Sequence, residues 1–339
     1  MKSKIRENYD LIDFLKFFFA CCVMITHTGL SKKISWGFYL QKLLCRLAVP
    51  FFFVCSGYFF AIKKHTKEDF LKRLKKLWVP YILLGIFYTL LPFYMDHLPL
   101  SFVFGQVFRL GLLSVGNVVW FLGSLIFSII LVFHIQSNKK LLIVSIVGSF
   151  LLYLLGLSFT TYAFLPKNFF FTELSNYLSV TFYNNRNPIF SGYLFFSIGY
   201  FIGRFYKDFR MKRWQYIILV PSIMILTYLE SSYIFTNFSK LVESDFLIMY
   251  IPLIIVLFLL SKNIKNLPFS TLIFRKMSII IFYLHMAIIY LYRYLIESGI
   301  LNSLNMQSKK FDLVVAITTI ALSYVISRLQ IIKRKEVIK

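Results

Sequence analysis

Apolar blocks about as long as a membrane is thick recur along this chain, and they constrain its fold more than any other feature. Hydrophobic residues make up 58% of the chain and charged residues only 15%. A soluble domain is closer to about half apolar and about a quarter charged. Because about 20 apolar residues in a helix cross the hydrocarbon core of a bilayer, the sequence predicts an all-α integral membrane protein.

Ten such segments can be distinguished, and each is expected to form a transmembrane helix. They are residues 11–30, 38–62, 77–96, 117–136, 141–158, 189–206, 214–232, 245–261, 276–296 and 310–330. Their apolar runs do not alternate in polarity as the strands of a membrane β-barrel do. We therefore expect a single polytopic membrane domain over residues 1–339.

The basic residues indicate the orientation. The net charge of +24 arises largely in the short connections between apolar segments. If the N-terminus is cytoplasmic, most Lys and Arg residues fall on the inside, as is typical of membrane proteins. Both termini are then expected in the cytoplasm. The protein is expected in the plasma membrane of a bacterial cell. Because the basic residues form no single solvated face, they favour contacts with membrane lipid over nucleic-acid binding.

The N-terminal run and the cysteines are expected to be structural. Lys2, Lys4 and Arg6 precede an apolar run as in a signal peptide, but no small-residue cleavage site follows, so we expect a retained helix. All four cysteines fall within apolar segments, where buried free thiols are expected rather than disulfides or metal ligands: Cys21, Cys22, Cys45 and Cys55.

The first segment carries charged side chains, each of which costs about 2.5–3.5 kcal/mol within a membrane on insertion scales. Asp13 and Lys16 are three residues apart, so they can pair on one helix face. His27 follows Lys16 by about three turns, on nearly the same face and ~16 Å further along the axis. Alternatively, Lys16 reaches the interface and His27 lies among outer headgroups. The shared stripe favours the functional interpretation.

The second segment adds a fixed positive charge. Arg46 is expected in its outer half, near the depth of His27, where a planar fork of donors suits substrate binding. Pro50 is expected to free a backbone carbonyl within the helix, and Ser56-Gly57 to let backbones approach closely, with Ser56 as a candidate substrate-binding residue. Packing with a kink is the structural alternative for this segment.

Other candidate binding residues lie at segment ends and at one position in mid-membrane. The basic residues before the third segment suit a polyphosphate, although a positive loop on anionic lipid looks the same: Lys72, Arg73, Lys75 and Lys76. Trp120 is either an interface anchor or a substrate contact. Arg186 and Asn187, at the outer start of the sixth segment, are expected to bind either lipid headgroups or a substrate. His285 lies in the middle of the ninth, where it is functional or held by a structural hydrogen bond.

Taken in order, these residues resemble the acyltransferase-3 family of membrane O-acyltransferases over nearly the whole chain. The family's first segment typically reads Asp, two residues, Arg, ten residues, His, which corresponds to Asp13, Lys16 and His27. Lys16 keeps the charge of the usual Arg without its planar fork. The other similar motifs are Arg46 with Pro50, Ser56-Gly57-Tyr58, Trp78-Val79-Pro80-Tyr81, Trp120-Phe121-Leu122 and Tyr283-Leu284-His285.

The resemblance implies an enzyme that moves an acyl group from cytoplasmic acyl-coenzyme A, usually acetyl-CoA, to a hydroxyl of a cell-envelope glycan or lipid-linked precursor. It implies His27 as the base, and Asp13 and Lys16 as further catalytic residues on the same helix. An imidazole titrates near neutral pH and suits this task. Arg46 could bind an acidic acceptor or stabilise an oxyanion. No metal is expected.

Transport remains the alternative function. The stretch Asn185-Arg186-Asn187-Pro188, which runs into Gly199-Tyr-Phe-Ile-Gly203-Arg204, resembles the membrane half of serine racemases linked to vancomycin resistance. That half belongs to the same family and has been associated with bringing serine across the membrane. The acceptor, the acyl chain and the oligomeric state stay open.

Overall fold

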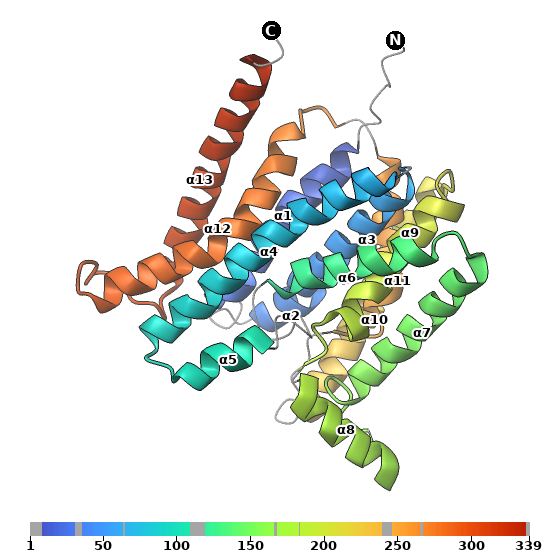
Figure 1. Cartoon of the computed structure of the whole chain (residues 1–339), viewed down its shortest axis with the longest axis horizontal. Helices are drawn as coiled ribbons and strands as arrows, with labels where there is room; N and C mark the ends of the chain where they lie inside the picture. Colours follow the sequence, from blue (N-terminus) through green and yellow to red (C-terminus); the bar gives the residue numbers. More distant parts are fainter. Residues whose placement is uncertain are drawn as a thin grey trace. The chain divides into compact units, whose positions relative to one another are not determined.

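The computed structural model describes residues 9–30, 36–63, 65–108, 119–165, 168–182, 184–238, 246–264 and 267–336. The regular secondary structure in these ranges is helical throughout (Figure 1). The elements are α1 (Asp10–Thr28), α2 (Gly37–Leu43), η2 (Cys45–Leu47), α3 (Ala48–Ala61), α4 (Lys67–Met95), α5 (Leu100–Phe108), α6 (Trp120–Ile135), α7 (Lys139–Ser158), α8 (Phe169–Phe182), η4 (Pro188–Gly192), α9 (Tyr193–Phe205), α10 (Arg213–Phe238), α11 (Tyr250–Asn263), α12 (Leu272–Glu297) and α13 (Lys309–Glu336).

Among the described residues, seven segments are long and apolar enough to cross a membrane, which agrees with the predicted all-α membrane class. They are Asp10–Thr28, Gly37–Ala61, Lys67–Met95, Lys139–Ser158, Arg213–Phe238, Leu272–Glu297 and Lys309–Lys333. Two other expected spans correspond to the shorter apolar helices α6 and α11. The last, 189–206, consists of the π-helical turn η4 followed by α9. The count of ten spans stays a prediction.

Two boundaries differ from the prediction for local reasons. The second segment breaks at the 3-10 turn η2, so the break precedes Pro50, which lies in the first turn of α3, where a missing N–H costs little. Helix α4 begins at Lys67 rather than near residue 77, because Thr66 and Asp69 form a capping box. A further helix, α8, lies in the connection between the fifth and sixth expected segments.

The chain forms two compact units. The first unit comprises Met1–Val49, Arg210–Pro221 and Val256–Lys339. The second unit comprises Pro50–Phe209 and Ser222–Ile255. Helix α10 passes from one unit to the other at Pro221, a proline inside the helix.

In the first unit, α1 packs along α12, and α12 forms a hairpin with α13 (Figure 1). Helices α1 and α12 run parallel, since the first turn of α1 contacts Thr271 and the last turn contacts His285. An apolar cluster closes the α12–α13 hairpin: Ile288, Leu304, Phe311 and Val315. Helix α13 therefore returns toward the end of the unit at which α1 begins.

In the second unit, glycines let α3 and α9 approach closely. A Cβ atom at Gly57 would lie 1.9 Å from the Phe196 carbonyl oxygen, and one at Gly199 would lie 1.9 Å from the Val54 carbonyl oxygen. No other residue type fits such contacts. The close backbone approach expected at Ser56-Gly57 is thus confirmed. The turn η4 packs against α6, α7 and α9.

Candidate functional site

The polar residues Asp13, Lys16 and His27 of helix α1 fall on nearly one face of the helix. The helix runs without interruption from Asp10 to Thr28 and ends at Gly29, which adopts φ 81°, a left-handed conformation that glycine favours. His27 therefore lies in the last turn, about three turns beyond the half-buried Lys16. A positive imidazole there would interact favourably with the carboxyl end of the helix.

The first turn of α1 holds the start of α12. The buried Asp13 forms an ion pair with Arg275, whose Nε lies 3.5 Å from Asp13 Oδ2. The carboxylate of Asp10 accepts hydrogen bonds from the Thr271 hydroxyl at 2.7 Å and from the Leu267 N–H at 3.3 Å. Both carboxylates thus fix the register of α12 on α1. Pairing of Asp13 with Lys16 stays a prediction.

At the other end of this helix pair, two imidazoles meet. The ring centroids of His27 and His285 are 5.2 Å apart, with the planes inclined at 42°. His285 is fully buried, and its Nδ1–H donates to the Ile281 carbonyl at 2.9 Å. Its buried Nε2 has no hydrogen-bond partner among the described residues. In a neutral imidazole of this tautomer, Nε2 is an acceptor, and the neighbouring His27 ring is the more exposed of the two.

Arg46 belongs to the same unit and lies on the turn η2, which packs on α1. The thiol of the neighbouring Cys45 is hydrogen-bonded to the Cys22 thiol and to the Thr26 side chain. Since Thr26 precedes His27, these contacts place η2 alongside the last turns of α1. Arg46 itself is half-buried. All four cysteines are free thiols.

The other predicted binding residues belong to the second unit, where most of their polar groups are already engaged. The Ser56 hydroxyl donates to the Phe52 carbonyl of its own helix at 2.7 Å. Trp120 is buried, with its ring 5.8 Å from that of Phe53. Asn187 caps the turn η4, and Arg186 is half-buried just before it.

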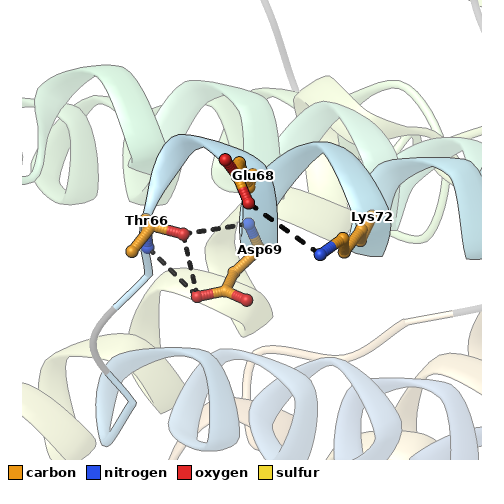
Figure 2. A network of polar contacts seen from close by, with 4 residues as sticks. All are labelled: Thr66, Glu68, Asp69 and Lys72. Carbon is orange, nitrogen blue, oxygen red and sulfur yellow. Dashed lines mark hydrogen bonds and ion pairs between the residues drawn. The ribbon is translucent and has the colours of Figure 1, made fainter.

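The predicted basic loop is the beginning of helix α4, and its cations differ in environment. Lys72 pairs with Glu68 at 3.9 Å, next to the capping contacts of Thr66 and Asp69 (Figure 2). Both partners of this pair are largely exposed, so the pair adds little stability. Lys75 and Lys76 are exposed and follow at helical spacing, so the three lysines share one face.

Arg73 turns away from this lysine face toward Phe60. Its guanidinium carbon lies 5.1 Å from the centroid of the Phe60 ring, and His65 stacks on the same ring at 4.2 Å. Burial lowers the pKa of His65, although its hydrogen bond to the Phe60 carbonyl opposes this shift. Arg73 therefore packs the helix start in addition to carrying charge.

A half-buried carboxylate on α10, Glu230, which the sequence did not single out, is bonded to the segment that follows α7. Tyr162 donates its hydroxyl to Glu230, which also accepts the Ile248 N–H at 2.8 Å and the Met249 N–H at 3.1 Å. Burial raises the pKa of Tyr162, and the Glu230 carboxylate reinforces the shift. Every oxygen of Glu230 is engaged, which indicates a structural role. In the part of the chain that the structure describes, no three His, Cys, Asp or Glu side chains are placed to hold a metal ion.

Comparison with known proteins decides the family. The acyltransferase-3 family model, described as an acyltransferase domain, matches residues 9–328 and so runs through both units. The chain belongs to the acyltransferase-3 family. This acyltransferase-3 protein is also 27% identical over 226 residues to an amino-acid racemase of Enterococcus faecalis. That alignment covers 61% of this chain and only 30% of the racemase. No solved structure is significantly similar.

Two polar residues of this acyltransferase-3 protein escaped the sequence analysis. Arg275 falls just before the ninth expected segment, 276–296, although α12 begins at Leu272. Asn185 was noted only as part of a polar stretch, yet it is 1% exposed. A carboxylate in the first segment that needed a partner was the one available signal for Arg275.

Proposed function

We propose that this protein transfers an acyl group, most simply acetyl, from acyl-coenzyme A to a hydroxyl of a cell-envelope glycan or lipid-linked precursor. In this proposal the chain crosses a bacterial plasma membrane ten times, with both termini and the donor in the cytoplasm and the acceptor at the outer face. Family membership supports acyl transfer, and the distribution of Lys and Arg supports the orientation. Parallel packing of α1 and α12 fits, because the first and ninth of ten spans run in the same direction.

The contact between the imidazoles of His27 and His285, 5.2 Å apart, carries the proposal. A hydroxyl group is a weak nucleophile until a base removes its proton. Imidazole is the side chain best suited to that task near neutral pH. A second, buried imidazole whose Nε2 is available as an acceptor can hold the first in one tautomer.

In the proposed reaction, His27 takes the proton of the acceptor hydroxyl while the hydroxyl oxygen attacks the thioester carbonyl carbon of the donor. The carbon–sulfur bond then breaks, and the imidazolium returns the proton to the departing thiolate of coenzyme A. His285 acts through His27, as a positioning residue. Arg46, on the turn beside the last turns of α1, would stabilise the oxyanion that forms on the carbonyl. An acyl-histidine intermediate is the alternative route.

The remaining charged residues have two other roles in this proposal, which are to hold the helix pair in register and to bind the donor. Asp13 sets the register of the two imidazoles by holding Arg275 of α12. The exposed face of Lys72, Lys75 and Lys76 offers the charge that the polyphosphate of coenzyme A requires. Arg73, packed on Phe60, would shape that face rather than form the main contact.

The test is an assay of detergent-purified protein with radiolabelled acetyl-coenzyme A. The wild-type protein should transfer or slowly hydrolyse the acetyl group. The variant His27→Ala should lower the rate about 10²–10⁴-fold, the usual contribution of a positioned base. His97→Asn is the matched control, because His97 is exposed at φ 50°, which Asn tolerates. Wild-type protein that neither binds acetyl-coenzyme A nor releases its thiol would overturn the proposal.

A second candidate function rests on the match to the amino-acid racemase of Enterococcus faecalis. Transport of a serine-like amino acid across the membrane is the activity proposed in this case for a chain that matches only part of that relative. Reconstituted vesicles loaded with buffer and exposed to radiolabelled L-serine distinguish the two functions. Uptake without any acetyl-coenzyme A chemistry favours transport, whereas acetyl release without uptake favours the enzyme.

A further inference from the structure

Three asparagines in one turn of the second unit have different hydrogen-bond environments. Asn184 Oδ1 accepts the Arg186 N–H at 2.9 Å. Asn187 Oδ1 accepts the N–H groups of Ile189 and Phe190 at 3.0 and 2.9 Å, and its Nδ2 donates to the Asn184 carbonyl at 3.2 Å. These bonds fix the backbone of the turn and leave Asn185 as the exception.

The side-chain amide of Asn185 is buried without a hydrogen bond. The residue is 1% exposed, and neither its Oδ1 nor its Nδ2 has a partner among the described residues. Its backbone carbonyl, in contrast, accepts the Ser191 hydroxyl at 2.7 Å. A buried amide with neither end satisfied lowers stability, so the folding of this turn does not explain it.

The surroundings of Asn185 have the features of a formed site. The turn leads into η4, a single π-helical turn, and such turns are frequent at functional sites. A Cβ atom at Gly156 of α7 would lie 3.3 Å from Asn185 Cβ and 2.8 Å from Phe190 Cβ, so the glycine lets the turn close against α7. Ser124 of α6 lies against Gly192 at the end of η4, and its buried Oγ is also without a partner in the described part of the chain.

From this geometry we infer that Asn185 binds a hydroxyl group of a small ligand. A side-chain amide presents one acceptor and two donor hydrogens, and a ligand hydroxyl can both donate to Oδ1 and accept from Nδ2. In the proposed orientation, Gly156 lies near the outer end of its helix, the side of the acceptor. The inference depends on the proposed function only in identifying this hydroxyl compound as the acyl acceptor.

The experiment measures the melting temperature of the full chain in detergent, with and without defined hydroxyl compounds. The probes are N-acetylglucosamine for a glycan, and L-serine for an amino acid with L-alanine as its match without a hydroxyl. Without a probe, Asn185→Leu should raise the melting temperature by about 2–4 °C, since it removes an unsatisfied buried amide. Asn187→Leu is the control from the same turn and should lower it, since that amide is fully bonded.

A hydroxyl probe should raise the melting temperature of the wild-type protein, L-alanine should not, and Asn185→Leu should lose the shift. The inference is overturned if Asn185→Leu destabilises the protein as Asn187→Leu does, or if neither hydroxyl probe stabilises the wild type. Hydrolysis of acetyl-coenzyme A by Asn185→Leu, measured in parallel, separates this outcome from the proposed function. Loss of probe binding with hydrolysis retained supports the site, whereas absent hydrolysis in every variant refutes only the enzyme.

Discussion

The two ends of the α1–α12 helix pair use polar side chains in opposite ways. At the end where both helices begin, Asp13 and Arg275 neutralise each other, and Asp10 bonds to Thr271. Three turns further on, His27 and His285 lie in ring contact, and Nε2 of His285 has no hydrogen-bond partner among the described residues. A satisfied charge pair is what a fold requires, whereas an available imidazole nitrogen is what a proton transfer requires.

This difference suggests a division of labour within one pair of helices. Ion pairing sets the register, since Asp13 and Arg275 meet only at one relative position of the helices. The same register then determines which residue of α12 lies opposite His27. The structural end should therefore respond to mutation through stability, and the imidazole end through turnover.

The largest effect is expected from Arg275→Met, which removes the guanidinium that forms an ion pair with the buried Asp13 carboxylate. The Asp13 side chain is 10% exposed and that of Arg275 is 33% exposed, so part of the interaction is screened by water. We expect a loss of about 2–4 kcal/mol, at or below the cost of breaking a fully buried pair. Thermal unfolding in detergent measures it.

A double variant tests whether this effect is electrostatic. Asp13→Asn with Arg275→Gln removes both charges and keeps two groups that can form a hydrogen bond. It should be more stable than Arg275→Met, because no charge remains buried. A double variant as unstable as Arg275→Met would show that the packing of Arg275, rather than its charge, holds α12.

Removal of the His285 imidazole should reduce turnover, in addition to the stability lost through the cavity at this buried position. His285→Ala should lower kcat about 10–100-fold, less than loss of the base itself, with the KM for acetyl-coenzyme A unchanged. His285→Gln, which keeps an acceptor, should recover part of the rate. His134→Ala is the matched control, since His134 makes the same local bond, to the Ile130 carbonyl at 2.8 Å, but is exposed. Equal kcat values for His285→Ala and His134→Ala would mean that His27 acts alone.

The sequence predicted the residues that α1 contributes to the two ends of the helix pair better than those that α12 contributes. Asp13 and His27 stand out because charged and polar side chains are rare in an apolar run. The partner Arg275 does not stand out, since basic residues are common where a span begins, and only tertiary contacts assign one of them to a buried carboxylate. Likewise, the sequence shows a polar stretch at residues 184–187, but not which of its amides is left unsatisfied.

Helix boundaries were missed where local hydrogen bonds outweigh hydropathy. A hydropathy pattern starts the third span near residue 77, but the capping box of Thr66 and Asp69 starts α4 at Lys67. The second segment breaks at a 3-10 turn that carries Arg46 and packs on α1, and not at a kink at Pro50, which was the structural alternative. Cys45 of that turn interacts with Cys22 and Thr26, which belong to α1. No spacing within the second segment reveals these interactions.

Lys16 lies on α1 between the two ends, and its substitution should have the smallest effect. Lys16→Arg keeps the positive charge at a half-buried position and adds a planar fork of donors, so stability should change by less than about 0.5 kcal/mol. Lys16→Met removes the charge and should raise the KM for acetyl-coenzyme A with kcat retained, if this residue helps to hold the donor. Kinetics with varied acetyl-coenzyme A measure both parameters. A fall in kcat without a change in KM would assign Lys16 to the chemistry at His27. The polar residues of α1 would then act in the reaction at His27 rather than link donor binding at one end of the helix pair to the reaction at the other.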